Sequence, residues 1–404
     1  YALKKETDLN RQLDVFIQPF LQFHFLKDFS FRSKLNMALG VGDHERFIPS
    51  TVSRDRGSPP PSPTYGAYST NRNFNWQFRN TLRYEKDIEN HSIKALFGYN
   101  REHYSSYSSD INSQHYPSDI VETLNVPTQT QGNTFETNWS LISYMFRLNY
   151  DYKTKYLFTG TLRRDGSSRF GKNNRWGYFP SVSVGWNITK ESFFPNPQWL
   201  TNLKLRASYG FSGNNNIGNY TWLPTVSDAN YIFGESIKSG KILSRMGNFN
   251  LSWERSREFD MGLDLTLYKG KLNFVFDYYN KITENMLWGV DVPISSGYHS
   301  TMKNLGKIRN QGMEFQIHSV NISNNNFNWE TDFNISFNRN KVLDLGVVDR
   351  IRAGNKGYSI TVEGEPMARF YLWKKFGLFK NKQEVENNAT VSFQTVPGTP
   401  HFKD

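Results

Sequence analysis

The fold is decided by the stretch LRRDGSSRFGKNNRWGYFPSVSVGW, residues 162–186. Its centre places two glycines and Lys172 almost as in a phosphate-binding loop. That loop needs a Ser or Thr after the lysine to hold magnesium, and a helix whose first amides face the phosphate. Residue 173 is Asn, and Pro180 lies among alternating apolar residues, which indicates a strand. The sequence therefore predicts an outward-facing polar hairpin tip over residues 166–174, without a nucleotide.

Apolar residues recur at every second position along most of the chain. This alternation predicts an all-β fold of about 12 or 13 strands with no helix. Two of the stretches, 29–47 and 271–288, are longer than the roughly 5 or 6 residues of a typical globular strand. In one strand we expect a lipid-facing side and an inward-facing side, formed respectively by Ile142, Tyr144, Phe146 and Leu148, and by Ser143, Arg147 and Asn149.

Short and long connections alternate between these stretches. The short turns lie at 27–28, 87–90, 152–154, 268–270 and 323–326, with 189–202 as a longer member of the set. The long polar segments are 49–70, 107–137, 212–251, 289–302 and 341–366. A soluble sandwich or propeller has no reason to place every long loop at one end. The layout is typical of an outer-membrane β-barrel with brief periplasmic turns and long outer loops.

The composition of the chain excludes several classes of site and partner. The chain has 404 residues, no cysteine, 16% aromatic residues, a net charge of +11 and a mean hydropathy of -0.65. The absence of cysteine excludes disulfides, Cys-ligated zinc, iron–sulfur clusters and Cys nucleophiles. No stretch approaches the roughly 18 apolar residues of a membrane helix, but a membrane strand needs only about 10 residues, alternately apolar. The basic residues are scattered rather than clustered, so we expect no nucleic-acid partner.

Tyrosine and tryptophan gather near both ends of the strands. Tyr150, Tyr152, Trp186, Tyr268 and Trp329 lie near short turns, and Trp76, Trp176, Tyr178 and Trp253 lie near long loops. Two such belts are expected where rings sit at the two headgroup levels of a bilayer. The alternative is the ordinary enrichment of aromatic residues in β-sheets.

Signals of catalysis are weak. No His-Glu-x-x-His and no Gly-x-Ser-x-Gly element occurs, and the acidic pair Glu363 and Glu365 lies in a loop, where a solvated role is the default. We therefore expect no enzyme activity, no cofactor and no metal site.

Ligand contacts in a barrel come from its inner wall and outer loops. The aromatic candidates for substrate binding are Trp222, Tyr231, Trp288 and Tyr298, with membrane-belt or loop packing as the alternative role. A second group, Arg163, Arg164, Asp165 and Arg169, could line the outer vestibule. The alternative is an ion-paired tip that fixes loop geometry.

Several stretches resemble one family. RDGSSRFG at 164–171, WGYFPSVS at 176–183, LKLRASYG at 203–210, DMGLD at 260–264 and NQGME at 310–314 are similar to the SusC/RagA family of TonB-dependent outer-membrane transporters of Bacteroidota. The resemblance implies a transmembrane antiparallel β-barrel of about 22 strands filled by a plug. Residues 1–404 would be one internal barrel segment, because the chain opens without Met or signal peptide and the plug and last strands are absent from it.

The resemblance also implies a function. It predicts an importer of an oligosaccharide or peptide, energised by TonB through the missing N-terminal part and covered by a SusD-like surface lipoprotein. The protein would lie in the outer-membrane lipid of a Gram-negative cell. Two alternatives from other classes stay open at this point: a passive porin-like or structural barrel, and a soluble all-β binding protein.

Overall fold

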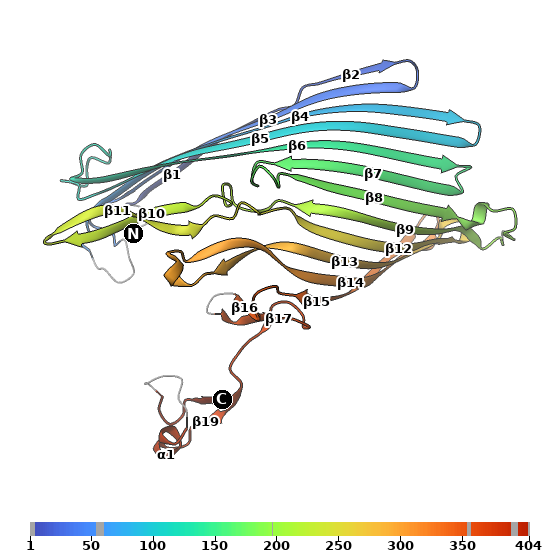
Figure 1. Ribbon diagram of the computed structural model, residues 1–404. Coiled ribbons are helices and arrows are strands. Elements are labelled where there is room, and N and C mark those ends of the chain that lie inside the picture. The colour runs from blue at the N-terminus through green and yellow to red at the C-terminus, as the bar shows by residue number, and fades with distance from the viewer. Residues whose placement is uncertain (1–4, 54–59, 196, 354–356, 389–394, 403–404) are drawn as a thin grey trace.

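The structure is a computed structural model that describes residues 5–53, 60–195, 197–353, 357–388 and 395–402. Its main element is one curved, 15-stranded sheet in which neighbouring long strands run antiparallel (Figure 1). The strands follow the order β1-β3-β4-β5-β6-β7-β8-β9-β12-β13-β14-β11-β10, with β2 on β3 and β15 on β14. Their bounds are β1 Thr7–Ile17, β2 Phe20–Phe25, β3 Phe29–Ile48, β4 Tyr65–Ile88, β5 His91–Gln114, β6 Gln129–Tyr152, β7 Tyr156–Ser167, β8 Trp176–Asn187, β9 Leu200–Asn214, β10 Thr225–Phe233, β11 Ser236–Met246, β12 Glu254–Leu267, β13 Leu272–Asp291, β14 Ser300–Ser323 and β15 Asn328–Asp344.

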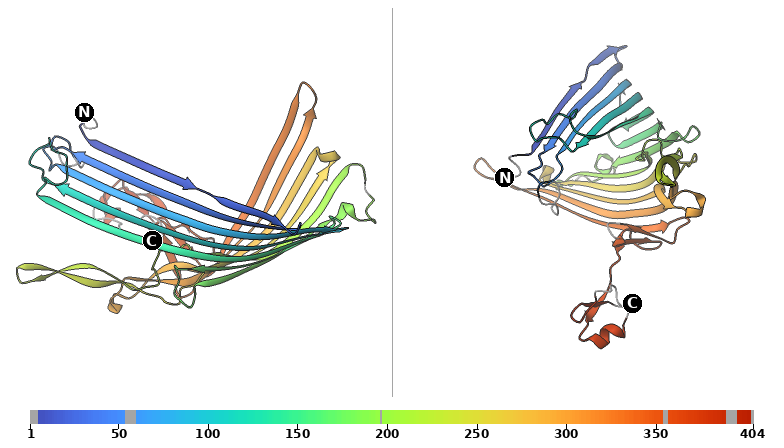
Figure 2. Two further views of the ribbon diagram at one scale, coloured as in Figure 1. Left: turned by 90° about the horizontal axis from the view of Figure 1, so that it is seen from above. Right: turned by 90° about the vertical axis from the view of Figure 1, so that its left-hand side faces the viewer.

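The sheet is an open trough (Figure 2). Strands β1 and β2 lie at one edge and β15 lies at the other, and no strand pairing joins the two edges among the described residues. Beyond β15 lie small elements at the C-terminal end: β16 Arg350–Ala353, β17 Ser359–Val362, β18 Arg369–Phe370, β19 Lys375–Leu378, α1 Lys382–Glu386 and β20 Pro400–Phe402. In the described ranges no helix is both long enough and apolar enough to cross a membrane.

The alternation of short and long connections agrees with the sequence, but the strands are longer than predicted. Parts of the predicted loops 49–70 and 107–137, namely 65–70, 107–114 and 129–137, extend the ladders of β4, β5 and β6. The reason is that both faces of these segments are polar, so the ladder continues without the apolar alternation on which the prediction relied. The predicted loop 212–251 contains the hairpin of β10 and β11.

The strand count and the absence of helices were also predicted imprecisely. Pro19 separates β1 from β2, because proline has no N–H to donate to the ladder. The helices are short: α1, and the 3-10 turns η2 Ile188–Lys190, η3 Tyr268–Gly270 and η4 Ile294–Ser296. Asn381 caps α1 by accepting a hydrogen bond from the Glu384 amide at 2.8 Å.

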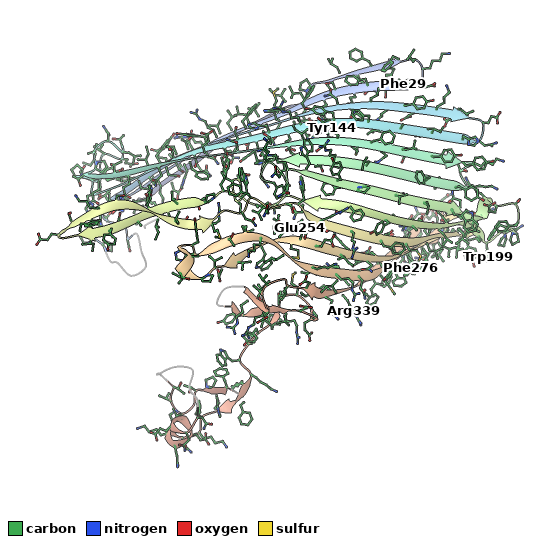
Figure 3. The ribbon with its side chains drawn as sticks, viewed as in Figure 1. Phe29, Tyr144, Trp199, Glu254, Phe276 and Arg339 are labelled. Carbon is green, nitrogen blue, oxygen red and sulfur yellow. The ribbon has the colours of Figure 1, made fainter. Side chains whose placement is uncertain are left out.

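One face of the sheet is apolar in continuous rows, and we call it the outer face. In one half of the sheet, directly paired residues form the row Phe31, Leu82, Phe97, Phe146 and Leu162. In the other half the row is Leu205, Leu263, Phe276, Phe315 and Ile335. Figure 3 labels Phe276 within the sheet, and Phe29 and Trp199 toward the end that carries the short turns. A soluble protein rarely exposes so large an apolar surface.

The opposite face, which we call the inner face, is polar. In β6, Tyr144 and Phe146 are 39% and 48% exposed on the outer face, whereas Ser143 is 4% exposed on the inner face. The Arg163 guanidinium donates a hydrogen bond to the Ser143 hydroxyl, and Arg147 donates to the Thr161 hydroxyl on the same inner side. The facing of β6 is therefore the one that the alternation predicts.

Glu191 closes the turn between β8 and β9. Its carboxylate accepts hydrogen bonds from Tyr156 Oη at 2.5 Å, Trp186 Nε1 at 3.0 Å and Lys155 Nζ at 3.1 Å. These donors, Tyr156 first, lower the pKa of Glu191 to about 2. A negative charge at this position therefore ties the start of β7 and the end of β8 to one turn.

The first prediction concerns the outer face. Phe146→Lys places a charge on the apolar row, and if that row lies at the bilayer midplane we expect a loss of about 2 to 4 kcal/mol in folding free energy. The measurement is urea-dependent folding into lipid vesicles. Arg147→Lys, a change on the inner face one residue away, serves as the control. Equal folding free energies for Phe146→Lys and the unchanged protein would show that the row does not face lipid.

The second prediction concerns pH. The pKa of Glu191 is lower in the folded state than the roughly 4.3 of an unfolded glutamate, so its stabilising effect is complete above about pH 4.5 and fades as pH falls toward about 2. We expect Glu191→Gln to lower the urea midpoint at pH 7, and the difference from the unchanged protein to shrink at pH 2.5. Glu89→Gln, in another short turn, is the control and should change neither midpoint. A difference that is the same at both pH values would contradict this prediction.

Candidate functional site

The glycine-rich connection between β7 and β8 is folded into a small core rather than standing free. Phe170 and Leu251 are fully buried, and Phe179, Ile217 and Trp253 complete the cluster. The prediction of an outward-facing polar hairpin tip is therefore wrong in part: β7 and β8 do pair, but their connection packs on the segments before β10 and after β11. The physical reason is Phe170, whose ring removes the loop from solvent.

Arg169 fixes the same loop from its other side. Its Nε donates to Asn219 Oδ1 at 3.0 Å, its Nη1 donates to the Asn215 carbonyl at 3.2 Å, and its guanidinium lies 5.0 Å from the centre of the Trp139 ring. Burial lowers the pKa of Arg169. At Gly171 a Cβ would lie 3.0 Å from the Phe249 carbonyl oxygen, so the backbone packs where a phosphate would have to bind. Arg169 therefore holds loop geometry.

The neighbouring charged candidates divide between the two faces. Arg163 donates to both carboxylate oxygens of the buried Asp165, at 2.9 and 2.7 Å, and lies on the inner face. Arg164 stacks on Trp176 and Tyr178, with 4.2 and 5.2 Å between the guanidinium carbon and the ring centres. The four residues 163–165 and 169 thus do not form one ligand-facing set.

The aromatic candidates lie in four different environments. Trp222 packs against Phe249 beside the loop core, with ring centres 5.7 Å apart. Tyr231 is 66% exposed in the β10–β11 hairpin, which projects from the sheet in Figure 1. Trp288 lines a small apolar cavity beside β14 and β15, and Tyr298 is half-buried in the connection after β13. Their role in substrate binding stays a prediction.

A polar groove, which the sequence analysis missed, runs along the inner face near the long-loop end. Its floor is the segment Gly40–Val41–Gly42 of β3, and its volume is about 380 Å³. Side chains on the inner face of β1, β4 and β5 form its walls: Asn10, Gln12, Asp14, Ser69, Asn71, Asn73, Ser108 and Asp110, with His44 from β3. The register places Gly40 between Asp14 and Asn73, and Gly42 between Gln12 and Asn71.

One wall of this groove belongs to a ladder of carboxamides. Asn71, Asn73, Asn75 and Gln77 occupy alternate positions of β4 and therefore share its inner face. Asn73 accepts a hydrogen bond from the Tyr104 hydroxyl at 3.0 Å, and Asn71 accepts one from Ser106 at 3.5 Å. The signal was present in the sequence as NRNFNWQ, residues 71–77, but amides on a strand carry no chemistry until their neighbours are known.

A second, larger cavity lies nearer the short turns and is basic. It has a volume of about 560 Å³ and is lined by Arg32, Lys34, Arg79, Arg83 and Arg163 with a single carboxylate, Glu102. Within the described ranges, Arg32, Lys34, Arg79 and Arg83 form no ion pair with a carboxylate. This part of the inner face is thus suited to an acidic surface or ligand.

Across the trough the inner face is acidic. Arg206 of β9 lies among three carboxylates, at 3.5 Å from Asp260, 3.1 Å from Asp264 and 2.6 Å from Asp277. Gly262 pairs with Arg206 in the ladder, and a Cβ there would lie 2.4 Å from the guanidinium carbon. The absent side chain therefore gives the guanidinium its place. In the part of the chain that the structure describes, no three His, Asp or Glu residues converge as metal ligands do.

The third prediction concerns the loop core. Phe170→Ala should open the loop, since truncating a buried Phe typically costs about 3 to 5 kcal/mol. We expect faster proteolysis of residues 168–175 and 215–224 while the sheet stays folded. Lys172→Ala, an exposed change in the same loop, is the control and should leave proteolysis unchanged. The purified protein should bind no ATP. ATP binding that Lys172→Ala abolishes, or equal proteolysis of both variants, would contradict the assignment.

Comparison with known proteins places this geometry in a family. Residues 8–380 match the family model described as TonB dependent receptor-like, beta-barrel. The TonB-dependent receptor P39 of Formosa agariphila is 34% identical over 97% of this chain and 37% of its own length. The TonB-dependent receptor SusC of Bacteroides thetaiotaomicron is 31% identical over 91% of this chain and 37% of its own length. The chain thus spans about two fifths of the length of the curated relatives it matches.

Solved structures agree with the sequence relatives. The RagAB peptide transporter superposes with a TM-score of 0.84 at 25% identity, over 93% of this chain and 42% of that chain. The same importer in its open-open state gives 0.82 at 26% identity, over 93% and 41%. The expected resemblance to SusC and RagA is confirmed, and so is the expected location in the outer membrane. The family consists of TonB-dependent receptors and transporters, which are not enzymes. This chain belongs to the family of TonB-dependent receptor β-barrels.

Proposed function

We propose that this chain is the barrel wall of an outer-membrane importer that takes up a nutrient with energy delivered by TonB. The observation that carries the proposal is the division of one long sheet into an apolar outer face and a polar, cavity-bearing inner face. A wall of this kind separates lipid from an aqueous passage. The relationship to SusC, named a TonB-dependent receptor, supports energised import over the passive porin-like alternative.

The cargo in this proposal is an oligosaccharide or a peptide. The solved RagAB relative is described as a peptide importer, which supports the peptide class, whereas the polar groove of this chain supports a hydrogen-bonding, hydroxyl-rich ligand. A cargo of either class needs hydrogen-bonding groups along the passage, and the inner face supplies them on β1 and β3 to β6.

The test of the function uses the full-length protein in the outer membrane. Uptake of a labelled cargo should stop when TonB is deleted or when a protonophore removes the inner-membrane gradient. A barrel that passes the cargo equally well without TonB is a passive porin, and the proposal of energised import is then wrong.

We further propose that a surface lipoprotein of the SusD type covers the outer mouth. The β10–β11 hairpin supports this, because it projects from the sheet (Figure 2) and exposes Ile232, Phe233 and Ile237 by 64% or more. Its link to the main sheet is a short parallel pairing of Arg245 and Met246 with β14. An apolar hairpin held at its base is suited to contact a separate partner.

The fourth prediction follows from this attachment. Deleting residues 227–239 removes the projecting part and leaves Arg245 and Met246 in place, so we expect weaker lipoprotein binding or weaker uptake with an unchanged barrel. A finer variant replaces the cross-strand pair Ile232 and Ile237 by Ser, and its control replaces by Ala the pair Asn230 and Ser239, two positions along the same hairpin. Co-purification of the lipoprotein is the measurement. The proposed contact is wrong if the deletion leaves co-purification and uptake intact.

A further inference from the structure

The floor of the polar groove is open because two residues lack side chains. Gly40 and Gly42 lie within β3 and neither adopts a positive φ, so the backbone does not require glycine at either position. A Cβ at Gly42 would lie 3.9 Å from its nearest neighbour, the Arg11 carbonyl oxygen. At Gly40 the nearest atom is Asp14 Oδ1, at 3.1 Å. Gly42 therefore leaves space that other inner-face residues do not fill, whereas the Asp14 carboxylate lies close beside Gly40.

The walls of that space hold unused hydrogen-bonding groups. The side-chain oxygens of Asn71 and Asn73 accept hydrogen bonds from Ser106 and Tyr104, but among the described residues their amide nitrogens have no acceptor. Below the groove on the same face of β3, Asn36 Oδ1 is buried without a hydrogen-bond partner in the described ranges. Asn71 is exposed and Asn73 is half-buried, so their amide N–H groups are free to donate to the hydroxyls of a ligand in the groove.

The charge of the groove limits which ligands can bind in it. Asp14 and Asp110 contribute carboxylates, and no Lys or Arg is among the lining residues. His44, the remaining titratable ring, is 2.8 Å from Asp8. A ligand that carries carboxylates or sulfates would be repelled, and its charges would find no cationic partner. An uncharged ligand meets no such penalty.

The shape and chemistry of the lining favour a saccharide over a peptide. Apart from Val41, whose side chain alternates to the outer face, every non-glycine residue of the lining is polar. There is thus no apolar pocket for peptide side chains, which usually provide the specificity of peptide sites. Planar carboxamides and carboxylates that offer both donors and acceptors match the neighbouring hydroxyls of a sugar ring.

We propose that the polar groove binds an uncharged oligosaccharide and rejects acidic ones. The inference deepens the proposed import function, on which it rests, by assigning a cargo class and a binding place. The groove lies nearer the outer end of β3, at Ile48, than the basic cavity, so cargo that enters from outside meets the neutral-selective groove first.

The experiment blocks the groove without straining the fold. Gly42→Leu adds a side chain where nothing lies within 3.9 Å of its Cβ, and Leu39→Phe adds bulk on the outer face three residues away as the matched control. The full-length protein in detergent is titrated by calorimetry with a panel of probes: neutral hexasaccharides of glucose, mannose, galactose and xylose, hexagalacturonate, and hexa-alanine. Circular dichroism and heat-modifiable gel mobility check that each variant is folded.

We expect at least one neutral hexasaccharide to bind and hexagalacturonate not to bind. Gly42→Leu should weaken the neutral ligand at least about tenfold, equal to about 1.4 kcal/mol, while Leu39→Phe stays within about twofold. The double variant Asp14→Asn with Asp110→Asn should admit hexagalacturonate, because it removes the repelling charges.

Four results would overturn the inference. They are binding of hexagalacturonate as tight as that of the neutral sugars, binding of hexa-alanine alone, binding of none of the panel, and neutral binding that Gly42→Leu leaves unchanged in a folded protein. In each case TonB-dependent uptake, measured separately, shows whether the import function still stands.

Discussion

Every backbone amide within the hydrocarbon layer has to find its partner in the protein, and this requirement organises the whole chain. A lone strand exposes its N–H and C=O groups, so a strand crosses lipid only as part of a paired ladder. The ladders from β3 to β6 run for 20 residues or more, well past the apolar rows. The strand pairing that lipid requires therefore continues beyond the lipid layer, where the paired strands carry polar side chains toward the outer mouth.

The period of two then determines what each face does. Phe97 and Phe146 meet across β5 and β6 on the outer face, while Asn100 and Ser143 meet three positions further along on the inner face. A shift of one residue in register would turn the charged row of Arg83 and Arg147 toward lipid. The apolar outer rows thereby fix the strand register, and the register determines which side chains lie on the polar inner face. Inner-face residues that contact cargo can therefore be substituted as long as the outer rows keep that register.

The sequence predicted the strands that cross the apolar band, because there the apolar alternation is complete, as in residues 142–148. It did not predict the outer halves of β5 and β6, because Ser, Asn and Tyr occupy both faces there. It predicted correctly that the loop at 166–174 lies between two strands. It did not predict that the loop is buried, because Phe170 packs against Leu251, about 80 residues away in the chain. The sequence favours aromatic residues as binding candidates, whereas the inner face offers amides, carboxylates and arginines whose role depends on their cross-strand neighbours.

Two strand glycines show that the role of an inner-face residue depends on the neighbouring strands and cannot be inferred from its own strand alone. Gly262 and Gly42 both lie within long strands, and neither has a positive φ. The Arg206 guanidinium fills the space above Gly262, where it joins three carboxylates of β12 and β13. Nothing within the described residues fills the space above Gly42. The absent side chain of Gly262 therefore stabilises the barrel wall, because it lets a half-buried ion-pair network form across strands. The absent side chain of Gly42 leaves a gap beside carboxamides whose N–H groups are free to donate, and a passing hydroxyl-rich cargo requires such groups.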